Sequence, residues 1–316
     1  MKRIVPILLC LCLCACNSAA PSQNSEKFTL TDEAPATEST NVCSVAFSGD
    51  GADIKGSGAY LNEGSLAITD GGEYTLSGNF SGCITVDITK NKKATLILSD
   101  LTVKSDTAAI NIISADKVNI VLRGKNSLSD GKTYADEKGA EPSACLYSAD
   151  DIEISGDGSL AVKANSKNGI ESKNDVKISG GSIEITAAKN AIKGKDSVKI
   201  SAGSINIPAC YDGIKSDNEK EDGRGIVEIT GGKISMTCSD DGIQAYRSVN
   251  VQSAEIKIGS DKLIYLPYLM GERTPILDVN SRGVFFGLSA MHTRAHMARA
   301  TMEGVSYSLY SCVELL

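Results

Sequence analysis

Five carboxylates in two short stretches are the strongest candidates for chemistry in this chain. They are Asp212, Asp217, Glu219, Asp240 and Asp241, and the first and last of them stand two residues before an isoleucine. Hard oxygen ligands of this kind are what Ca²⁺ requires, in sets of about six to eight. The sequence therefore predicts a calcium site around Asp212 and Asp241, with the other three carboxylates as further ligands.

The same position holds an amide in the two preceding occurrences of the pattern. Asn168 and Asn190 stand two residues before Ile170 and Ile192. Short Asx side chains at corners also hydrogen-bond their own backbone. A ladder of capping side chains is therefore the alternative to calcium at every such position, and it is what we expect for Asn168 and Asn190.

A second column of residues falls three positions after each of these isoleucines. Its members are Lys173, Lys195, Asp217 and Tyr246. If successive repeats stack about 4.8 Å apart, one face would offer two ammonium groups and a ring to a linear polymer. Tyr211 and Tyr246 are the candidates for stacking on such a ligand. A solvated face of mixed charge is the alternative interpretation.

A repeat that runs from residue 146 to 258 must position these groups. The anchor isoleucines of successive repeats are Ile170, Ile192, Ile214 and Ile243. Their spacings are 22, 22 and 29 residues, and the longer gap contains a polar insert at 217–225. Each anchor is followed by two alternating apolar pairs, for example Val176 with Ile178, which is typical of short strands with one buried face.

Glycine-rich corners separate the two apolar pairs of each repeat. Ser-Gly-Gly-Ser at 179–182 is one such corner, and its glycines can adopt a positive φ. A period near 22 residues with two or three strands predicts a right-handed parallel β-helix, because two-helix repeats have periods of about 33 to 47 residues. We expect this all-β solenoid to span 44–258 in about eight coils, with a loop at 129–142, and each coil to bury its apolar face against its neighbours.

The N-terminus has the features of a lipoprotein export signal. Residues 1–15 combine a basic start with an apolar stretch that is too short to span a bilayer. Leu13-Cys14-Ala15-Cys16 forms a lipobox that predicts lipidation at Cys16. Residues 16–43 are rich in small and polar residues and are expected to be a flexible tether. We therefore expect a lipid-anchored protein of the cell surface or envelope, with an ordinary secretory signal as the alternative.

The cysteines and the charge narrow the function further. Beyond the signal and Cys16, the remaining cysteines are Cys43, Cys83, Cys145, Cys210, Cys238 and Cys312. They show no C-x-x-C spacing, so buried free thiols are expected in preference to bridges or a metal site. The net charge is −7 and there is no basic stripe, which argues against nucleic acid as a partner. An oligomer is not expected.

The lipobox, the tether and two strings after Gly-Gly-x-Ile corners resemble a known family. The strings are Asp212-Gly-Ile-Lys-Ser-Asp217 and Asp240-Asp-Gly-Ile-Gln-Ala245. They are similar to the carbohydrate-binding-domain family of bacterial surface proteins, typified by a clostridial cellulose- and pectate-binding β-helix, over about residues 44–258. The resemblance implies non-catalytic binding of polysaccharide, either acidic and pectin-like or cellulose, and bound calcium. The carbohydrate-binding candidates are then Lys173, Lys195, Tyr211 and Tyr246.

The segment 259–316 breaks the apolar alternation and resembles a different family. Gly283-Val-Phe-Phe-Gly-Leu288 and His296-Met-Ala-Arg-Ala-Thr-Met-Glu303 match the signature of FGGY-type sugar kinases, above all xylulokinase. The matched signature positions are Gly283, Gly287, His296 and Glu303. Residues 291–309 are expected to be helical. The family's sugar-binding domain, catalytic Asp and nucleotide loop are missing, so we interpret this tail as an inactive fragment joined near 258–262.

Three alternative functions remain open at this stage. A calcium-dependent enzyme of the pectate-lyase type would need a base, but Arg123, Arg224 and Arg247 fall in different registers and no paired carboxylates stand out. A xylulokinase-type activity is suggested by the tail, which is incomplete. An adhesin or wall spacer would fit the absence of Trp and the aromatic content of 5%.

Overall fold

The computed structural model describes residues 41–134, 141–259, 263–269, 280, 282–288 and 292–313. The predicted signal peptide, Cys16 and most of the predicted tether lie outside these residues. Strand β1 (Asn41–Gly49) begins inside the last three residues of the predicted tether, and Cys43 on this strand is buried. The described chain is mostly β-strand in large parallel sheets, with one α-helix near its C-terminal end.

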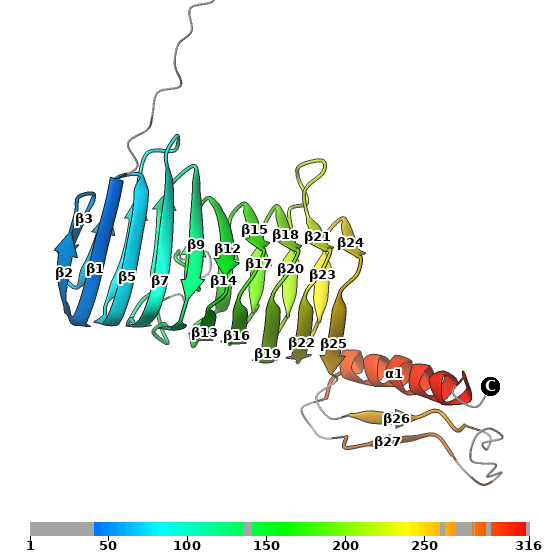
Figure 1. The fold of residues 1–316 in the computed structure, drawn as a ribbon. Helices are drawn as coiled ribbons and strands as arrows, with labels where there is room; N and C mark the ends of the chain where they lie inside the picture. Colours follow the sequence, from blue (N-terminus) through cyan, green and yellow to red (C-terminus); the bar gives the residue numbers. More distant parts are fainter. Residues whose placement is uncertain are drawn as a thin grey trace, which may run out of the picture. The chain divides into compact units, whose positions relative to one another are not determined.

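Most strands belong to three parallel ladders, in which each strand pairs with its counterpart one repeat further on (Figure 1). The first ladder contains β9 (Lys117–Arg123), β12 (Asp151–Gly156), β15 (Asp175–Ile178), β18 (Ser197–Ile200), β21 (Ile226–Ile229) and β24 (Ser248–Val251). The second contains β10 (Lys125–Ser129), β13 (Ser159–Ala164), β16 (Ser182–Ala187), β19 (Ser204–Cys210), β22 (Lys233–Cys238) and β25 (Glu255–Gly259).

The third ladder forms the separate sheet. It contains β4 (Ser65–Ile68), β6 (Cys83–Asp87), β8 (Ile110–Ser114), β11 (Ala144–Ser148), β14 (Asn168–Ser172), β17 (Ile192–Gly194), β20 (Ile214–Ser216) and β23 (Ile243–Ala245). Two long strands, β5 (Gly72–Ser81) and β7 (Lys93–Lys104), precede the point where the first and second ladders separate, because β7 pairs with both β9 and β10. One repeat of the predicted length thus supplies one strand to each ladder.

The register of the ladders stacks like residues on like. In the third ladder Ile170 pairs with Ile192 and Ile192 with Ile214, and all three side chains are fully buried. The apolar pairs of the other two ladders are stacked in the same way, as Val176 on Val198 shows. Burying one such side chain contributes about 1.5 to 3 kcal/mol. The hydrophobic core is therefore continuous along the repeats, and the burial predicted from the alternation is confirmed in every repeat before the last one.

The predicted glycine corners adopt the backbone conformation that calls for glycine. Gly181, Gly203 and Gly232 occupy equivalent corners of successive repeats with φ of 85°, 99° and 90°. Residues with a Cβ rarely adopt this region. The corners therefore explain why the repeat keeps a glycine between its two apolar pairs.

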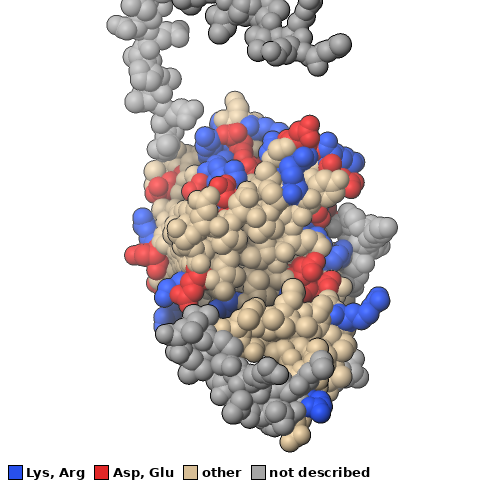
Figure 2. Space-filling view, turned by 90° about the vertical axis from the view of Figure 1, so that its right-hand side faces the viewer, with Lys and Arg blue, Asp and Glu red and all other residues tan. Residues whose placement is uncertain are grey.

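The two ends of the ladders differ. At the N-terminal end β1 pairs antiparallel with β2 (Gly51–Lys55), and β3 (Ala59–Asn62) pairs antiparallel with β4. At the other end Val249 and Val251 continue the core columns but are 43% and 48% exposed. Figure 2 looks at this end, where uncharged residues fill the middle of the view and charged residues gather along its upper edge.

The described tail contains two strands and one helix. Strands β26 (Ile264–Leu266) and β27 (Val284–Phe286) pair antiparallel, and helix α1 (Arg294–Val313) contacts β26. The helix predicted for 291–309 is thus present with shifted ends. Thr293 precedes it and donates its backbone N–H to His296 Nδ1 at 2.9 Å. In the described chain, no helix combines the length and the hydrophobicity that a membrane crossing requires.

Candidate functional site

Three of the five predicted calcium ligands meet where the chain passes from the second ladder to the third. Asp212 lies between β19 and β20, and Asp240 and Asp241 lie between β22 and β23 one repeat later. One carboxylate oxygen of each lies within 4.8 Å of the others. The backbones approach closely here, because a Cβ on Gly213 would stand 2.3 Å from the carbonyl oxygen of Gly242. The Asp-Gly-Ile string therefore combines a ligand with the glycine that lets the two corners stack.

The charges in this cluster are only partly balanced. Asp212 is 2% exposed, accepts the backbone N–H of Asp241 at 3.3 Å and contacts Lys215 Nζ at 3.1 Å. Gln244 Nε2 donates to Asp241 at 2.7 Å. The hydrogen bond to Asp240 raises the pKa of the Tyr211 hydroxyl. The three carboxylates outnumber the Lys215 ammonium group and the Arg299 guanidinium, which donates to the carbonyl oxygen of Asp240, so a net negative charge remains that a cation would neutralise.

The two asparagines of the same column form the expected capping ladder. Asn168 Oδ1 accepts both the backbone N–H and the side-chain amide of Asn190, at 3.1 and 2.8 Å. Asn168 in turn donates to Glu171 at 2.6 Å. The Oδ1 atom of Asn190 is buried and has no hydrogen-bond partner among the described residues. Because Asn190 precedes Asp212 in the column, this orphaned oxygen is a further candidate for a cation at the cluster.

Asp217 and Glu219 stand apart from the three clustered carboxylates. Asp217 is exposed at the far end of β20 and pairs with Lys193 Nζ at 2.9 Å, while Glu219 is exposed on the insert. Asn218 holds the insert instead: its amide donates to Asp196 at 2.6 Å and its Oδ1 accepts backbone N–H groups. The insert is therefore a capped loop, and within the described chain the carboxylate cluster comprises the other three residues.

The predicted polymer-binding residues divide between two corners. Lys173, Lys195, Asp217 and Tyr246 follow consecutive third-ladder strands, as predicted. Lys195 and Tyr246 are exposed, but Lys173 pairs with Glu141 at 2.9 Å and with Glu171 at 3.6 Å. Tyr211 instead precedes its strand and lies beside the carboxylate cluster, with 47% of its surface exposed.

Tyr211 belongs to a column that the sequence reasoning missed. Lys167, Lys189, Tyr211 and Asp240 occupy it, joined in order by backbone hydrogen bonds of 2.7 to 2.9 Å. Lys189 and Tyr211 are both exposed. The signal was available, since each of these residues immediately precedes an Asx of the anchor motif. This column places an ammonium group, a ring and a carboxylate on one corner.

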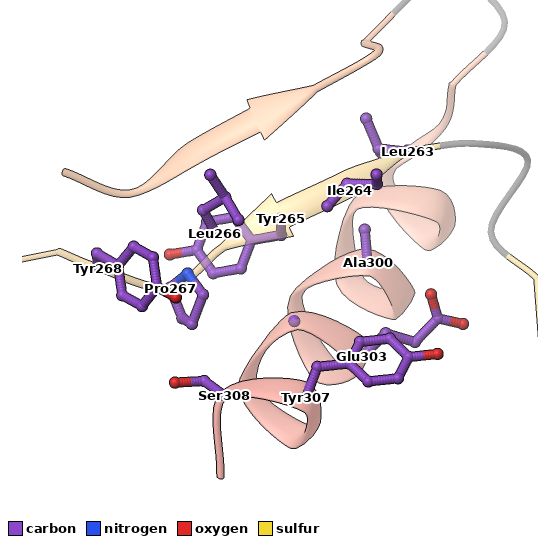
Figure 3. Close-up of a pocket in the computed structure, with 11 residues that line it drawn as sticks. Leu263, Ile264, Tyr265, Leu266, Pro267, Tyr268, Ala300, Glu303, Tyr307 and Ser308 are labelled. Carbon is purple, nitrogen blue, oxygen red and sulfur yellow. The ribbon is translucent and has the colours of Figure 1, made fainter. Parts of the chain in front are cut away.

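The kinase-signature residues lie in the tail. Gly283 and Gly287 flank β27, and His296 and Glu303 lie on α1. Glu303 lines a pocket between β26 and α1 together with Tyr265 and Tyr307 (Figure 3). His296 is buried and its Nε2 has no hydrogen-bond partner in the described chain. One residue of α1 reaches the carboxylate corner, because Arg299 Nη2 donates to the carbonyl oxygen of Asp240 at 3.0 Å.

Two different kinds of protein are similar to parts of this chain. Over 73 residues, 23% of this chain, the sequence is 42% identical to a xylulose kinase of Staphylococcus epidermidis, but this stretch is only 15% of that kinase. Over 207 residues the chain is 49% identical to a carbohydrate-binding domain-containing protein of Acetivibrio thermocellus, covering 72% of that protein.

A solved structure is similar over the ladders. It is titled as the structure of the polysaccharide lyase-like protein from C. thermocellum, gadolinium derivative, and it is 40% identical with a TM-score of 0.66. The similarity covers 69% of this chain and 90% of the solved one. The model of a family described as carbohydrate-binding domain-containing protein matches residues 62–282. The chain therefore belongs to the family of carbohydrate-binding domain-containing proteins.

Proposed function

We propose that this protein binds a polysaccharide at the corner that carries Tyr211 and the Asp212, Asp240 and Asp241 cluster. The observation that carries the proposal is an exposed ring next to three convergent carboxylates with excess negative charge. A cation held there would attract an acidic chain, and the ring would stack on a sugar. We further infer that the three ladders are the faces of a right-handed parallel β-helix, because each repeat gives one strand to each ladder in constant register.

Calcium is the cation that we propose for this corner. Asp212, Asp240 and Asp241 supply hard oxygens, and the buried Oδ1 of Asn190 lies one step along the same column. Calcium favours such oxygen-rich sites with flexible geometry. The similar solved structure is a gadolinium derivative. Acidic pectin-like chains are the ligands we favour, because their carboxylates can share a bound cation, and cellulose is the second choice.

Binding is favoured over bond cleavage by the positions of the arginines. Arg224 pairs with Asp196 at 3.3 Å, and Arg247 donates to Asp222 at 3.1 Å and to the insert backbone. Both thus hold the insert, and Arg123 lies several repeats away at the end of β9. None of these three bases belongs to the carboxylate corner, where β-elimination would need one. The arginine that does reach the corner, Arg299, donates to the carbonyl oxygen of Asp240. A calcium-dependent lyase is the second candidate, because the similar solved structure is titled lyase-like.

The cellular setting of this function rests on the N-terminal sequence. Residues 1–15 as an export signal and Cys16 as a lipid-bearing residue would place the binding domain on the cell surface or in the envelope, where polysaccharides occur. A polysaccharide and a membrane, reached through the lipid, are the partners that we propose. The kinase-like tail would take no part in catalysis.

Retention on immobilised glycans tests the proposal. The chain without its first 16 residues should be retained on polygalacturonate in calcium and released by a chelator, with no rise in absorbance from unsaturated product. The variant D212N should lose most of the retention, whereas D157N, which alters an exposed carboxylate outside the cluster, should keep it. Equal retention of D212N and the unchanged chain would refute the site, and an absorbance rise would favour the lyase.

A further inference from the structure

Two buried cysteines lie side by side directly beneath the carboxylate corner. Cys210 ends β19 and Cys238 ends β22, and the two are paired in register. Their sulfur atoms are 3.3 Å apart, and the residues are 8% and 1% exposed. Among the five described cysteines, these two are the ones whose sulfurs contact each other. Neighbouring parallel strands hold Cα atoms about 4.8 Å apart, which lies within the range that a disulfide spans.

A local irregularity of β19 brings the first sulfur to this position. Ile205 and Ile207 face the core, and strict alternation would continue with Ala209. The register shifts between Ile207 and Cys210, so Cys210 takes the inward position opposite Cys238. A bulge re-aims one side chain at the cost of regular pairing. The juxtaposed thiols thus depend on an extra residue in this strand of the repeat.

The pair is chemically suited to oxidation. The Cys210 thiol donates a hydrogen bond to the Cys238 sulfur, and the two sulfur atoms are already in contact. A thiolate is the attacking species in thiol–disulfide exchange. Because Cys238 accepts this hydrogen bond, we assign Cys238 as the nucleophile and Cys210 as the resolving thiol.

We propose that Cys210 and Cys238 form a disulfide that fixes the two repeats carrying Asp212, Asp240 and Asp241 to each other. In the first step the Cys238 thiolate attacks a small-molecule or enzyme disulfide and releases one of its thiols. In the second step the Cys210 sulfur attacks the mixed disulfide, loses its proton and releases the second thiol. Two protein thiols are oxidised and one external disulfide is reduced to two thiols, so electrons and atoms balance.

The disulfide would affect the carboxylate corner because both cysteines stand close to the clustered carboxylates in the sequence. Cys210 is followed by Tyr211 and Asp212, and Cys238 precedes Asp240 by two residues. The link would fix the spacing of the two corners whose carboxylates converge. A tighter hold on a cation is the expected consequence, and this consequence rests on the proposed function, whereas the bond itself does not.

Refolding in a glutathione redox buffer tests the bond without relying on access to the folded interior. The refolded chain is denatured, its free thiols are alkylated, and the count is compared with that of a fully reduced sample. We expect two fewer thiols and one linked pair of peptides containing residues 210 and 238. C210S and C238S should each abolish the linked pair, and C145S, which alters another fully buried cysteine, should leave it in place. Full alkylation of both thiols in the refolded chain would overturn the proposal.

Two further readouts keep the bond and its effect separate. The Tm of the oxidised chain should exceed that of the reduced chain, so reductant should lower the Tm of the unchanged protein. Reductant should leave the Tm of C210A and of C238A unchanged. Terbium luminescence then compares cation affinity in the two redox states. Equal affinity would refute the link to the cation while the peptide map still establishes the bond.

Discussion

At the scale of single residues, the exchange of an amide for a carboxylate changes what one column of the fold can do. Asn168 donates to Glu171 and accepts from Asn190, so an amide side chain links these two successive repeats. Asp212 cannot donate, and it gathers a backbone N–H and an ammonium group instead. Between Asn190 and Asp212 the column therefore changes from hydrogen-bonded capping amides to a carboxylate that is a candidate cation ligand.

Tyr211 is the residue whose removal should weaken glycan binding most selectively. Y211A removes the ring beside the cluster but none of the three carboxylates, so affinity for polygalacturonate should fall by about 3-fold to 10-fold, as expected for an aromatic contact of about 0.5 to 1.5 kcal/mol. Y246A removes a ring of similar exposure from the other end of the third-ladder strands and should have a smaller effect. Titration of the glycan against both variants measures this, and a larger loss in Y246A would move the site to the other corner.

At the scale of the elements, the apolar alternation predicted the strands well but said little about the polar corners. Val176 with Ile178 and the first three anchor isoleucines are buried as expected, because their spacing alone determines which face they occupy. The last anchor, Ile243, is only partly buried. Asp217 was predicted beside Asp212, yet the third-ladder strand carries it to the opposite corner and into an ion pair with Lys193. The Tyr211 column was missed because stacking between repeats, and not proximity in sequence, brings its members together.

The loss of unfolding free energy on replacing a stacked isoleucine of the third ladder with alanine should depend on its place in the ladder. Ile192 is fully buried between two neighbours, so I192A should lower the free energy of unfolding by about 2 to 5 kcal/mol, since a cavity is left in a packed column. Ile243 ends the column and is partly exposed, so I243A should cost less. Urea unfolding of both variants provides the comparison, and equal losses would show that the last repeat is packed as tightly as the middle ones.

An ion pair across the first ladder should make a small, pH-dependent contribution. Lys117 on β9 donates to Glu153 on β12, and this hydrogen bond lowers the pKa of Glu153 from its ordinary value of 4.5. A lowered pKa in the folded state stabilises the fold above the unfolded value, and the contribution is lost as pH falls through the folded value. K117M should therefore cost up to about 1 kcal/mol at pH 7.

The difference between K117M and the unchanged chain should shrink as pH falls below 4.5. Chemical denaturation at a series of pH values measures it. K163M, which removes an exposed ammonium group on β13, serves as the control and should show no such trend. A pH-independent difference for K117M would attribute the loss to packing of the lysine stem instead of the ion pair.

At the scale of the whole molecule, a long repeat is followed by a tail with a different pattern of elements. The repeat has antiparallel strands at its N-terminal end, whereas its last strands leave Val249 and Val251 partly exposed. The tail has its own strand pair and helix, and its pocket is lined by residues 263–268 and by α1. The core of the repeat contains no tail residue among those described. The two segments therefore stabilise themselves largely by separate contacts.

This separation predicts that removing the tail leaves the repeat folded and functional. A chain ending at Gly259 should keep its cooperative unfolding, its terbium binding and its retention on polygalacturonate, because the ladders and Asp212, Asp240 and Asp241 all precede that residue. The described contact that would be lost at the site is the hydrogen bond from Arg299 to the carbonyl oxygen of Asp240. R299A in the full chain removes this contact together with the other interactions of the Arg299 side chain and keeps the rest of the tail. A change shared by both variants would therefore come from Arg299, whereas a collapse confined to the shortened chain would show that the tail protects the exposed end of the repeat.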